Sequence, residues 1–187
     1  MGKPKLPEPV VLVVAVTAQN REILNRAKGE LEGLFGPVAM ESPVFPFDFT
    51  RYYEDEMGPE LIKQFAAFKR PFRPDDLASI KLLTNSLEDH MALNKDGRRF
   101  RRANIDPGYL ALSKLVLATT KDYAHRIYIG KGIYAEVTLI FRKGMWQPLE
   151  WTYPDYRTDL ALDFFGKVRK HLLRLRTTPC TPWVSYR

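Results

Sequence analysis

The chain has 187 residues, of which 45% are hydrophobic, 27% charged and 12% aromatic, a composition typical of one soluble globular domain. This composition excludes collagen, a coiled coil and wholesale disorder. Lysine and arginine outnumber aspartate and glutamate by 29 to 22, so the formal net charge is +7. A domain of this length buries roughly 70% of its unfolded surface, so it needs neither a disulfide nor a metal to fold.

The basic excess is concentrated in one segment of the chain. Between Lys95 and Lys131 there are nine basic and three acidic residues, a net charge of +6, which leaves +1 for the remaining 150 residues. Such a local asymmetry indicates an anionic partner, although a basic loop that only keeps the protein soluble would give the same pattern.

Cysteine and histidine usage indicate the compartment and the metal content. The single cysteine, Cys180, cannot form an internal disulfide, and no two of the three histidines are spaced as a ligand pair. We therefore expect a cytoplasmic protein without a metal site or a cofactor. No stretch approaches the roughly 20 apolar residues that span a bilayer, so no membrane partner is expected.

The first fifty residues predict a strand, a helix and a second strand. Residues 10–16 form a valine-rich apolar run, typical of a strand covered on both faces. Residues 17–35 have apolar positions at helical spacing, with Thr17 as the expected cap. Residues 38–49 contain two prolines and therefore predict an edge or bulged strand. This order favours a β-α-β start.

The middle of the chain is harder to interpret. Residues 51–74 are irregular, with a short helix expected over 59–68, and Pro74 begins a second helix with apolar residues on one face. The segment from Asp106 to Leu117 fits either a short helix or a turn between strands, and its pattern does not decide between them.

The last third predicts an antiparallel hairpin and a closing helix. Residues 125–129 and 133–141 alternate around Gly130-Lys131-Gly132, which places Tyr128 opposite Tyr134 and Arg126 opposite Glu136. Residues 145–148 predict a third strand, and residues 159–176 an amphipathic helix.

These elements predict one α/β domain over residues 1–187, with an α+β arrangement as the alternative. We expect a mixed sheet with a β-α-β start and a C-terminal antiparallel hairpin, and helices packed on the sheet. The nearest simple architecture is ferredoxin-like. Residues 1–9 and 177–187 are expected to be irregular.

Known catalytic motifs fail on their spacing. Gly130-Lys131-Gly132 precedes a strand, whereas a phosphate-binding loop opens a helix. Thr120-Lys121-Asp122 lacks one residue of the guanine-reading pattern, and no Gly-x-Ser-x-Gly elbow occurs. What remains is a group of polar and tyrosine residues between 102 and 136.

This group predicts a site for a phosphate or a carboxylate, because cations supply charge-assisted hydrogen bonds and tyrosine faces stack on rings. The expected ligand-binding residues are Arg102, Lys121, Arg126, Lys131, Glu136, Tyr128 and Tyr134. The expected proton-transfer residues, if a reaction occurs, are Asp106, Asp122 and His125. The alternative readings are structural: Arg126 and Glu136 as a cross-strand ion pair, Asp106 as a helix cap, and His125 as a hydrogen-bonded core residue.

Several segments are similar to those of a bacterial family known only as domain of unknown function 4416. The similarity runs over most of the chain and is carried by long segments, among them Asn-Ile-Asp-Pro-Gly-Tyr-Leu at 104–110, residues 125–139 and Trp-Thr-Tyr-Pro-Asp-Tyr at 151–156. The resemblance implies a compact cytosolic bacterial protein. It supplies no activity and no catalytic residues.

Three functions therefore remain open from the sequence. The first is binding of, or catalysis on, a small phosphorylated or nucleotide-like anionic ligand. The second is RNA binding by the basic segment 95–102 together with the basic face of the last helix. The third is a protein-interaction adaptor without a ligand. The sequence decides neither whether a reaction is catalysed nor the oligomeric state.

Overall fold

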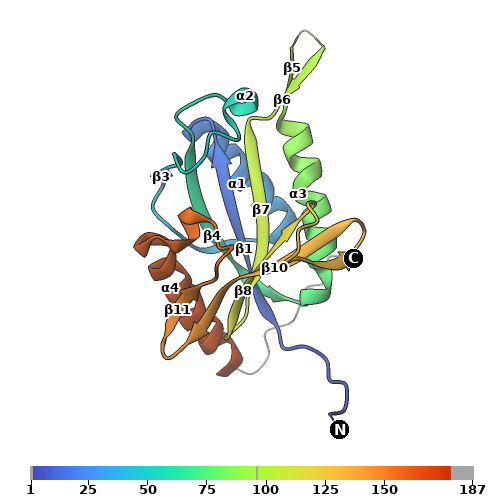
Figure 1. The fold of residues 1–187 in the computed structure, drawn as a ribbon, viewed down its shortest axis with the longest axis vertical. Helices are drawn as coiled ribbons and strands as arrows, with labels where there is room; N and C mark the ends of the chain where they lie inside the picture. Colours follow the sequence, from blue (N-terminus) through green and yellow to red (C-terminus); the bar gives the residue numbers. More distant parts are fainter. Residues whose placement is uncertain (1, 96, 178–187) are drawn as a thin grey trace.

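The computed structural model describes residues 2–95 and 97–177, which form one α/β domain built on a large twisted sheet (Figure 1). The helices are α1 (Arg21–Phe35), α2 (Glu54–Met57), α3 (Leu77–Met91) and α4 (Asp159–Thr177). The strands are β1 (Val10–Ala18), β2 (Val38–Glu41), β3 (Phe45–Pro46), β4 (Ile62–Phe72), β5 (Leu93–Lys95), β6 (Arg98–Phe100), β7 (Ala103–Leu110), β8 (Lys114–Thr119), β9 (Ile127–Gly130), β10 (Ile133–Arg142) and β11 (Met145–Pro148).

The first half of the chain has the predicted ferredoxin-like arrangement. The main sheet runs β11-β10-β8-β7-β1-β4-β2, so the order β7-β1-β4-β2 comes from a β-α-β-β-α-β unit formed by β1, α1, β2, β4, α3 and β7. β4 lies between β1 and β2, so the two strands of the predicted β-α-β start are not neighbours in the sheet. Every strand pair described is antiparallel, which corrects the expected mixed sheet and corresponds to the α+β alternative.

Strand β1 is buried on both faces, as its apolar run predicts. Its side chains alternate between two cores, because successive residues of a strand point to opposite faces. Leu12 and Val14 pack with α1 and α3, whereas Val13 and Ala15 pack with α4. The helices therefore cover both faces of the sheet, with α4 on one side and α1 and α3 on the other (Figure 1).

Three local predictions change. Asn20, not Thr17, caps α1, since its Oδ1 accepts a hydrogen bond from the Ile23 amide at 3.0 Å while Thr17 stays in β1. The helix expected over 59–68 is wrong, because this stretch enters β4, which pairs with β1 along its whole length. The undecided segment 106–117 belongs to two strands, β7 and β8, and the turn between them.

The predicted hairpin, third strand and closing helix of the C-terminal third are confirmed. Of the tail 177–187 that is expected to be irregular, Thr177 belongs to α4 and the rest lies outside the described residues. β9 and β10 form the predicted hairpin, in which Tyr128 faces Tyr134 and Ile127 faces Ala135. β11 has the predicted bounds, and α4 begins at the predicted Asp159. Cys180 lies outside the described residues. Among the helices of the described chain, none combines the length and the apolarity that crossing a membrane requires.

Close contact between β7 and β8 depends on Gly108. A Cβ atom added at this position would lie 2.3 Å from the Val116 carbonyl oxygen and 2.7 Å from Leu117 Cδ2. Both are core atoms of the neighbouring strand, so they have little freedom to move. We therefore expect Gly108→Ala to lower the free energy of unfolding by about 2–3 kcal/mol, measured by urea denaturation.

The matched control is Gly29→Ala on the exposed side of α1, where a new Cβ would meet no atom within 4 Å. Alanine is the better helix former, so this variant should be more stable than wild type by up to about 1 kcal/mol. A Gly108→Ala protein within about 0.5 kcal/mol of wild type, the range of ordinary surface substitutions, would show that the two strands can separate at low cost.

Candidate functional site

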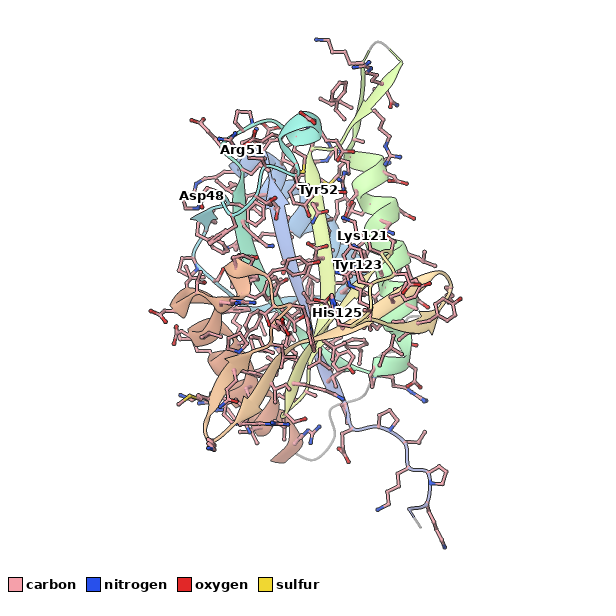
Figure 2. The ribbon with its side chains drawn as sticks, viewed as in Figure 1. Asp48, Arg51, Tyr52, Lys121, Tyr123 and His125 are labelled. Atoms are coloured by element: carbon pink, nitrogen blue, oxygen red, sulfur yellow. The ribbon has the colours of Figure 1, made fainter. Side chains whose placement is uncertain are left out.

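A cavity lined by charged and aromatic side chains opens where β7 and β8 separate. Their described pairing covers only Gly108–Leu110 against Leu115–Leu117, and beyond it Asn104 and Asp106 pair with β1 alone. This cavity has a volume of about 370 Å³. It lies on the same face of the sheet as α4, because Asp106 pairs with Ala15, whose side chain packs on the α4 side. The segments 47–53, 119–123 and 153–156 form its walls (Figure 2).

Side chains from α3 bind the backbone groups of β7 that no neighbouring strand pairs. The amide of Ile105 donates to Glu88 Oε1 at 2.7 Å, and the carbonyl of Ile105 accepts from Lys81 Nζ at 2.9 Å. A neighbouring strand would normally satisfy both backbone groups, and an unsatisfied buried pair would be costly. Two charged side chains of one helix thus replace β8 along this stretch, and both reach the cavity.

These side chains belong to a closed polar network around Ile105. Arg101 donates to Asn104 Oδ1 at 3.2 Å, and Asn104 donates to Asp106 Oδ2 at 2.7 Å. Lys81 Nζ lies 3.6 Å from Asp106 Oδ1, and Arg101 lies 3.6 Å from Glu88 Oε2. The network fixes the orientation of the Asp106 carboxylate, whose side chain is 31% exposed in the cavity wall.

Burial raises the pKa of two groups in the cavity wall, Glu88 of this network and Tyr53. It raises the pKa of Glu88 to about 7, and this effect outweighs the lowering by Lys81, by the Ile105 amide and by Arg101. Burial, and next the Asp106 carboxylate, raise the pKa of Tyr53 well above its usual value, so that hydroxyl stays protonated. The cavity wall therefore contains a glutamate that titrates near neutral pH.

A second ion pair lines the cavity. Arg126 Nε donates to Glu136 Oε2 at 2.7 Å, and both side chains are 1% exposed. The guanidinium also donates to the carbonyl of Lys121 at 3.0 Å and to the hydroxyl of Tyr153 at 2.8 Å. It lies 4.4 Å from the ring centre of Tyr123. The predicted ion pair of Arg126 and Glu136 is thus present, although Arg126 precedes β9, and it holds the loop that carries Lys121.

A third ion pair, almost completely buried, also lines the cavity. Lys63 Nζ of β4 is 2.8 Å from Asp155 Oδ2, with the two side chains 5% and 4% exposed. The same ammonium lies 4.8 Å from the ring centre of Phe47. This contact joins the central sheet to the 3₁₀ turn Pro154–Arg157 that precedes α4.

The mouth of the cavity is formed by two loops that meet through aromatic and cationic groups. Lys121 Nζ lies 4.2 Å from the ring centre of Tyr52, and Tyr52, Lys121 and Tyr123 lie near one another (Figure 2). In the described chain Lys121 has no carboxylate within ion-pair distance. The wall carries five cations, Lys63, Lys81, Arg101, Lys121 and Arg126, and four carboxylates, Glu88, Asp106, Glu136 and Asp155. Arg101 also pairs with Glu56, which does not line the wall, and Lys121 is the one wall cation that has no ion-pair partner in the described chain.

Four of the ten predicted site residues line the cavity: Asp106, Lys121, Arg126 and Glu136. His125 lies beside them; its Nε2 is 3.1 Å from Glu136 Oε2, and its ring stacks on Trp151. Of the predicted proton-transfer residues, Asp106 alone belongs to the wall, since His125 and Asp122 are absent from it.

The other predicted residues lie elsewhere. Tyr128 and Tyr134 contact each other edge to face on the β9–β10 hairpin, 5.4 Å apart, and Asp122 lies near Tyr134. Lys131 donates to Ser79 Oγ at 2.7 Å in a separate depression. Arg102 does not line the cavity. The predicted convergence of these residues on one site with Lys121 is therefore not found.

Sequence reasoning missed much of the wall. Lys63, Lys81, Glu88 and Arg101 come from β4, α3 and the β6–β7 junction, outside the group first considered or not singled out within it. A usable signal was present in α3, where Lys81 and Glu88 stand among the buried apolar positions. Charged residues are rarely fully buried unless they are paired, so they mark a polar site.

The fold and the cavity define a ferredoxin-like α/β domain extended by a hairpin and a closing helix, with a charged, aromatic-lined pocket on one sheet face. Among the described residues there is no group of three His, Cys, Asp or Glu that could hold a metal ion. The chain belongs to the family described as domain of unknown function 4416, whose model matches residues 8–172. No curated protein and no solved structure matches it.

Proposed function

We propose that the cavity binds a small anionic ligand with a planar ring, of which a nucleotide is the representative class. The observation that carries the proposal is the meeting of several ion pairs and an unpaired lysine around one aromatic-lined cavity. Its volume, about 370 Å³, falls in the range of about 300–1,000 Å³ of small-molecule sites.

The ion pairs favour a binding role over a stabilising one. Two of them, Arg126–Glu136 and Lys63–Asp155, are almost completely buried. Removing such charges from water costs about as much as their attraction returns, and apolar residues of the same size often stabilise a protein equally well. The position of these ion pairs around one cavity therefore supports a ligand-binding role for the cavity.

The distribution of groups suggests how a ligand would lie. Lys121 and the hydroxyls of Thr119 and Thr120 offer an anionic group a cation and hydrogen-bond partners at the mouth. Tyr52 and Tyr123 offer ring faces beside them. Deeper in the wall, Asp106 would accept a hydrogen bond from a hydroxyl or amino group of the ligand. Asp106 is also our candidate for proton transfer if the ligand reacts.

The test is titration calorimetry with the four common nucleoside monophosphates, with their nucleosides and with inorganic phosphate. We expect at least one monophosphate to bind, and Lys121→Met to weaken it by about 10- to 100-fold, the loss of a charge-assisted hydrogen bond. Binding of the matching nucleoside should change little.

Lys114→Met is the matched control, because Lys114 is an exposed lysine of β8 that does not line the cavity. It should bind the monophosphate as wild type does. The proposal is wrong if no monophosphate binds, or if both lysine variants bind with unchanged affinity.

A further inference from the structure

Strands β5 and β6 form a hairpin arm outside the main sheet. They pair only with each other and project beyond the end of α3 at one extremity of the molecule (Figure 1). The chain leaves β6 at Phe100, and the next residue, Arg101, already lines the cavity. The arm therefore begins at the wall of the proposed nucleotide site.

The two faces of the arm differ. Lys95 pairs with Arg98 and Leu93 pairs with Phe100, so these four side chains share one face, because alternate residues of a strand point the same way. Leu93 is 52% exposed and Phe100 half-buried. One face thus carries cations toward the tip and apolar groups, one of them an aromatic ring, at the root. Proteins that bind single-stranded nucleic acids combine cationic tracks with aromatic platforms in this way.

The positive charge of this face has no ion-pair partner among the described residues. Arg99, on the opposite face, pairs with Asp89 of α3. Lys95 and Arg98 are exposed, and within the described chain neither has a carboxylate partner at ion-pair distance. At the root, Arg102 Nε is buried and has no hydrogen-bond partner among the described residues.

We infer that the ligand of the cavity is one nucleotide of a single-stranded nucleic acid, and that the arm binds the phosphates that flank it. This inference rests on the proposed function. An extended strand rises about 3.3 Å per residue, so Arg98 lies about 7 Å along β6 from Phe100, the residue before Arg101, close enough to bind a phosphate next to the bound nucleotide. A free mononucleotide would fill the cavity and leave the arm unused.

The arm alone forms this surface. The RNA-binding surface expected from the sequence combined the arm with the basic face of the last helix, but α4 lies at the far end of the molecule from the arm (Figure 1). One short strand of nucleic acid in the cavity would meet the arm and not α4. The inference therefore assigns the flanking contacts to Lys95 and Arg98.

The test measures binding of fluorescent 5′-phosphorylated oligoribonucleotides of one, two, four and eight residues, at several salt concentrations. Affinity should rise about tenfold or more from the monomer to the tetramer. In the double variant Lys95→Ser/Arg98→Ser the gain with length should disappear while monomer affinity is kept. The slope of log affinity against log salt should fall by about 1.4, the contribution of two single-strand phosphate contacts.

The matched control is Lys167→Ser/Lys170→Ser, which removes the same charge from the exposed side of α4. It should keep both the length dependence and the salt slope. Monomer binding without a gain with length would overturn this inference and leave the proposed function standing, whereas no binding at any length would overturn both. Displacement of the octamer from the arm by polyglutamate at equal concentration would also overturn it, in favour of an acidic protein partner.

Discussion

Replacing Arg126 with methionine is expected to lower the free energy of unfolding by about 3–5 kcal/mol at neutral pH, the cost of leaving a buried charge without its partner. The side chain of Glu136 is 1% exposed, so its carboxylate depends on the guanidinium as its main compensating charge. His125 remains 3.1 Å from the carboxylate as a hydrogen-bond partner. The Tyr153 hydroxyl and the Lys121 carbonyl also lose a donor. Urea denaturation measures the effect.

A double-mutant cycle separates the pair from its surroundings. Arg126→Met combined with Glu136→Met removes both charges, and most of the lost stability should return, because no charge is left buried. The control is Lys167→Met, which breaks an ion pair with Asp163 in which both side chains are 66% exposed, and it should cost less than about 0.5 kcal/mol. Single and double variants of equal stability would contradict the prediction.

The same cycle bears on why the pair exists. If the double variant is as stable as wild type, then stability does not explain two charges in the wall of a cavity. Loss of nucleotide binding in that stable double variant would then assign the pair to the ligand, either by direct contact or through the Lys121 loop that Arg126 holds. Retained binding would instead show that the ligand needs neither the pair nor its contact with that loop.

The elements that could be predicted from the sequence are those in which buried and exposed residues alternate at a regular spacing. The β9–β10 hairpin shows alternation across a turn in which Lys131 takes a positive φ of 55° between two glycines, so its pairing follows from local chemistry. β4 has no such signal. Its run from Phe65 to Phe68 is buried on both faces, and a short apolar run of this kind fits a strand or a helix equally well. This run becomes a strand because it pairs with β1, a long-range contact that the local sequence pattern does not indicate.

The site was only partly predictable for a related reason. Lys121, Arg126 and Glu136 are close in sequence and meet across one hairpin, which a local pattern can indicate. Lys81 and Glu88 reach the same cavity from α3 only because β7 separates from β8 and leaves backbone groups for them to bind. No spacing in the chain encodes that separation. The residues that complete the wall therefore follow from the fold and not from a motif.

The glutamine variant of Glu88 is expected to gain stability relative to wild type as the pH rises from about 4.5 to 8. The pKa of Glu88 is about 7 in the folded protein, against 4.5 as its usual value. Between these values the folded protein binds a proton that the unfolded chain has released, so the free energy of unfolding falls as the pH rises. The contribution is complete below pH 4.5, is lost above about pH 7, and amounts to about 3 kcal/mol.

Comparing the two proteins at each pH isolates this one group, because all other titrating groups are common to both. The difference in unfolding free energy, Glu88→Gln minus wild type, should rise by about 3 kcal/mol across this range, and the control Glu30→Gln, on the exposed side of α1, should show a much smaller change. A difference that does not vary with pH would mean that Lys81 and Arg101 keep Glu88 ionised. The protonation state of Glu88 should also affect ligand binding. When Glu88 is protonated, three carboxylates remain against five cations in the wall, so an anion should bind more tightly below pH 7 than above it.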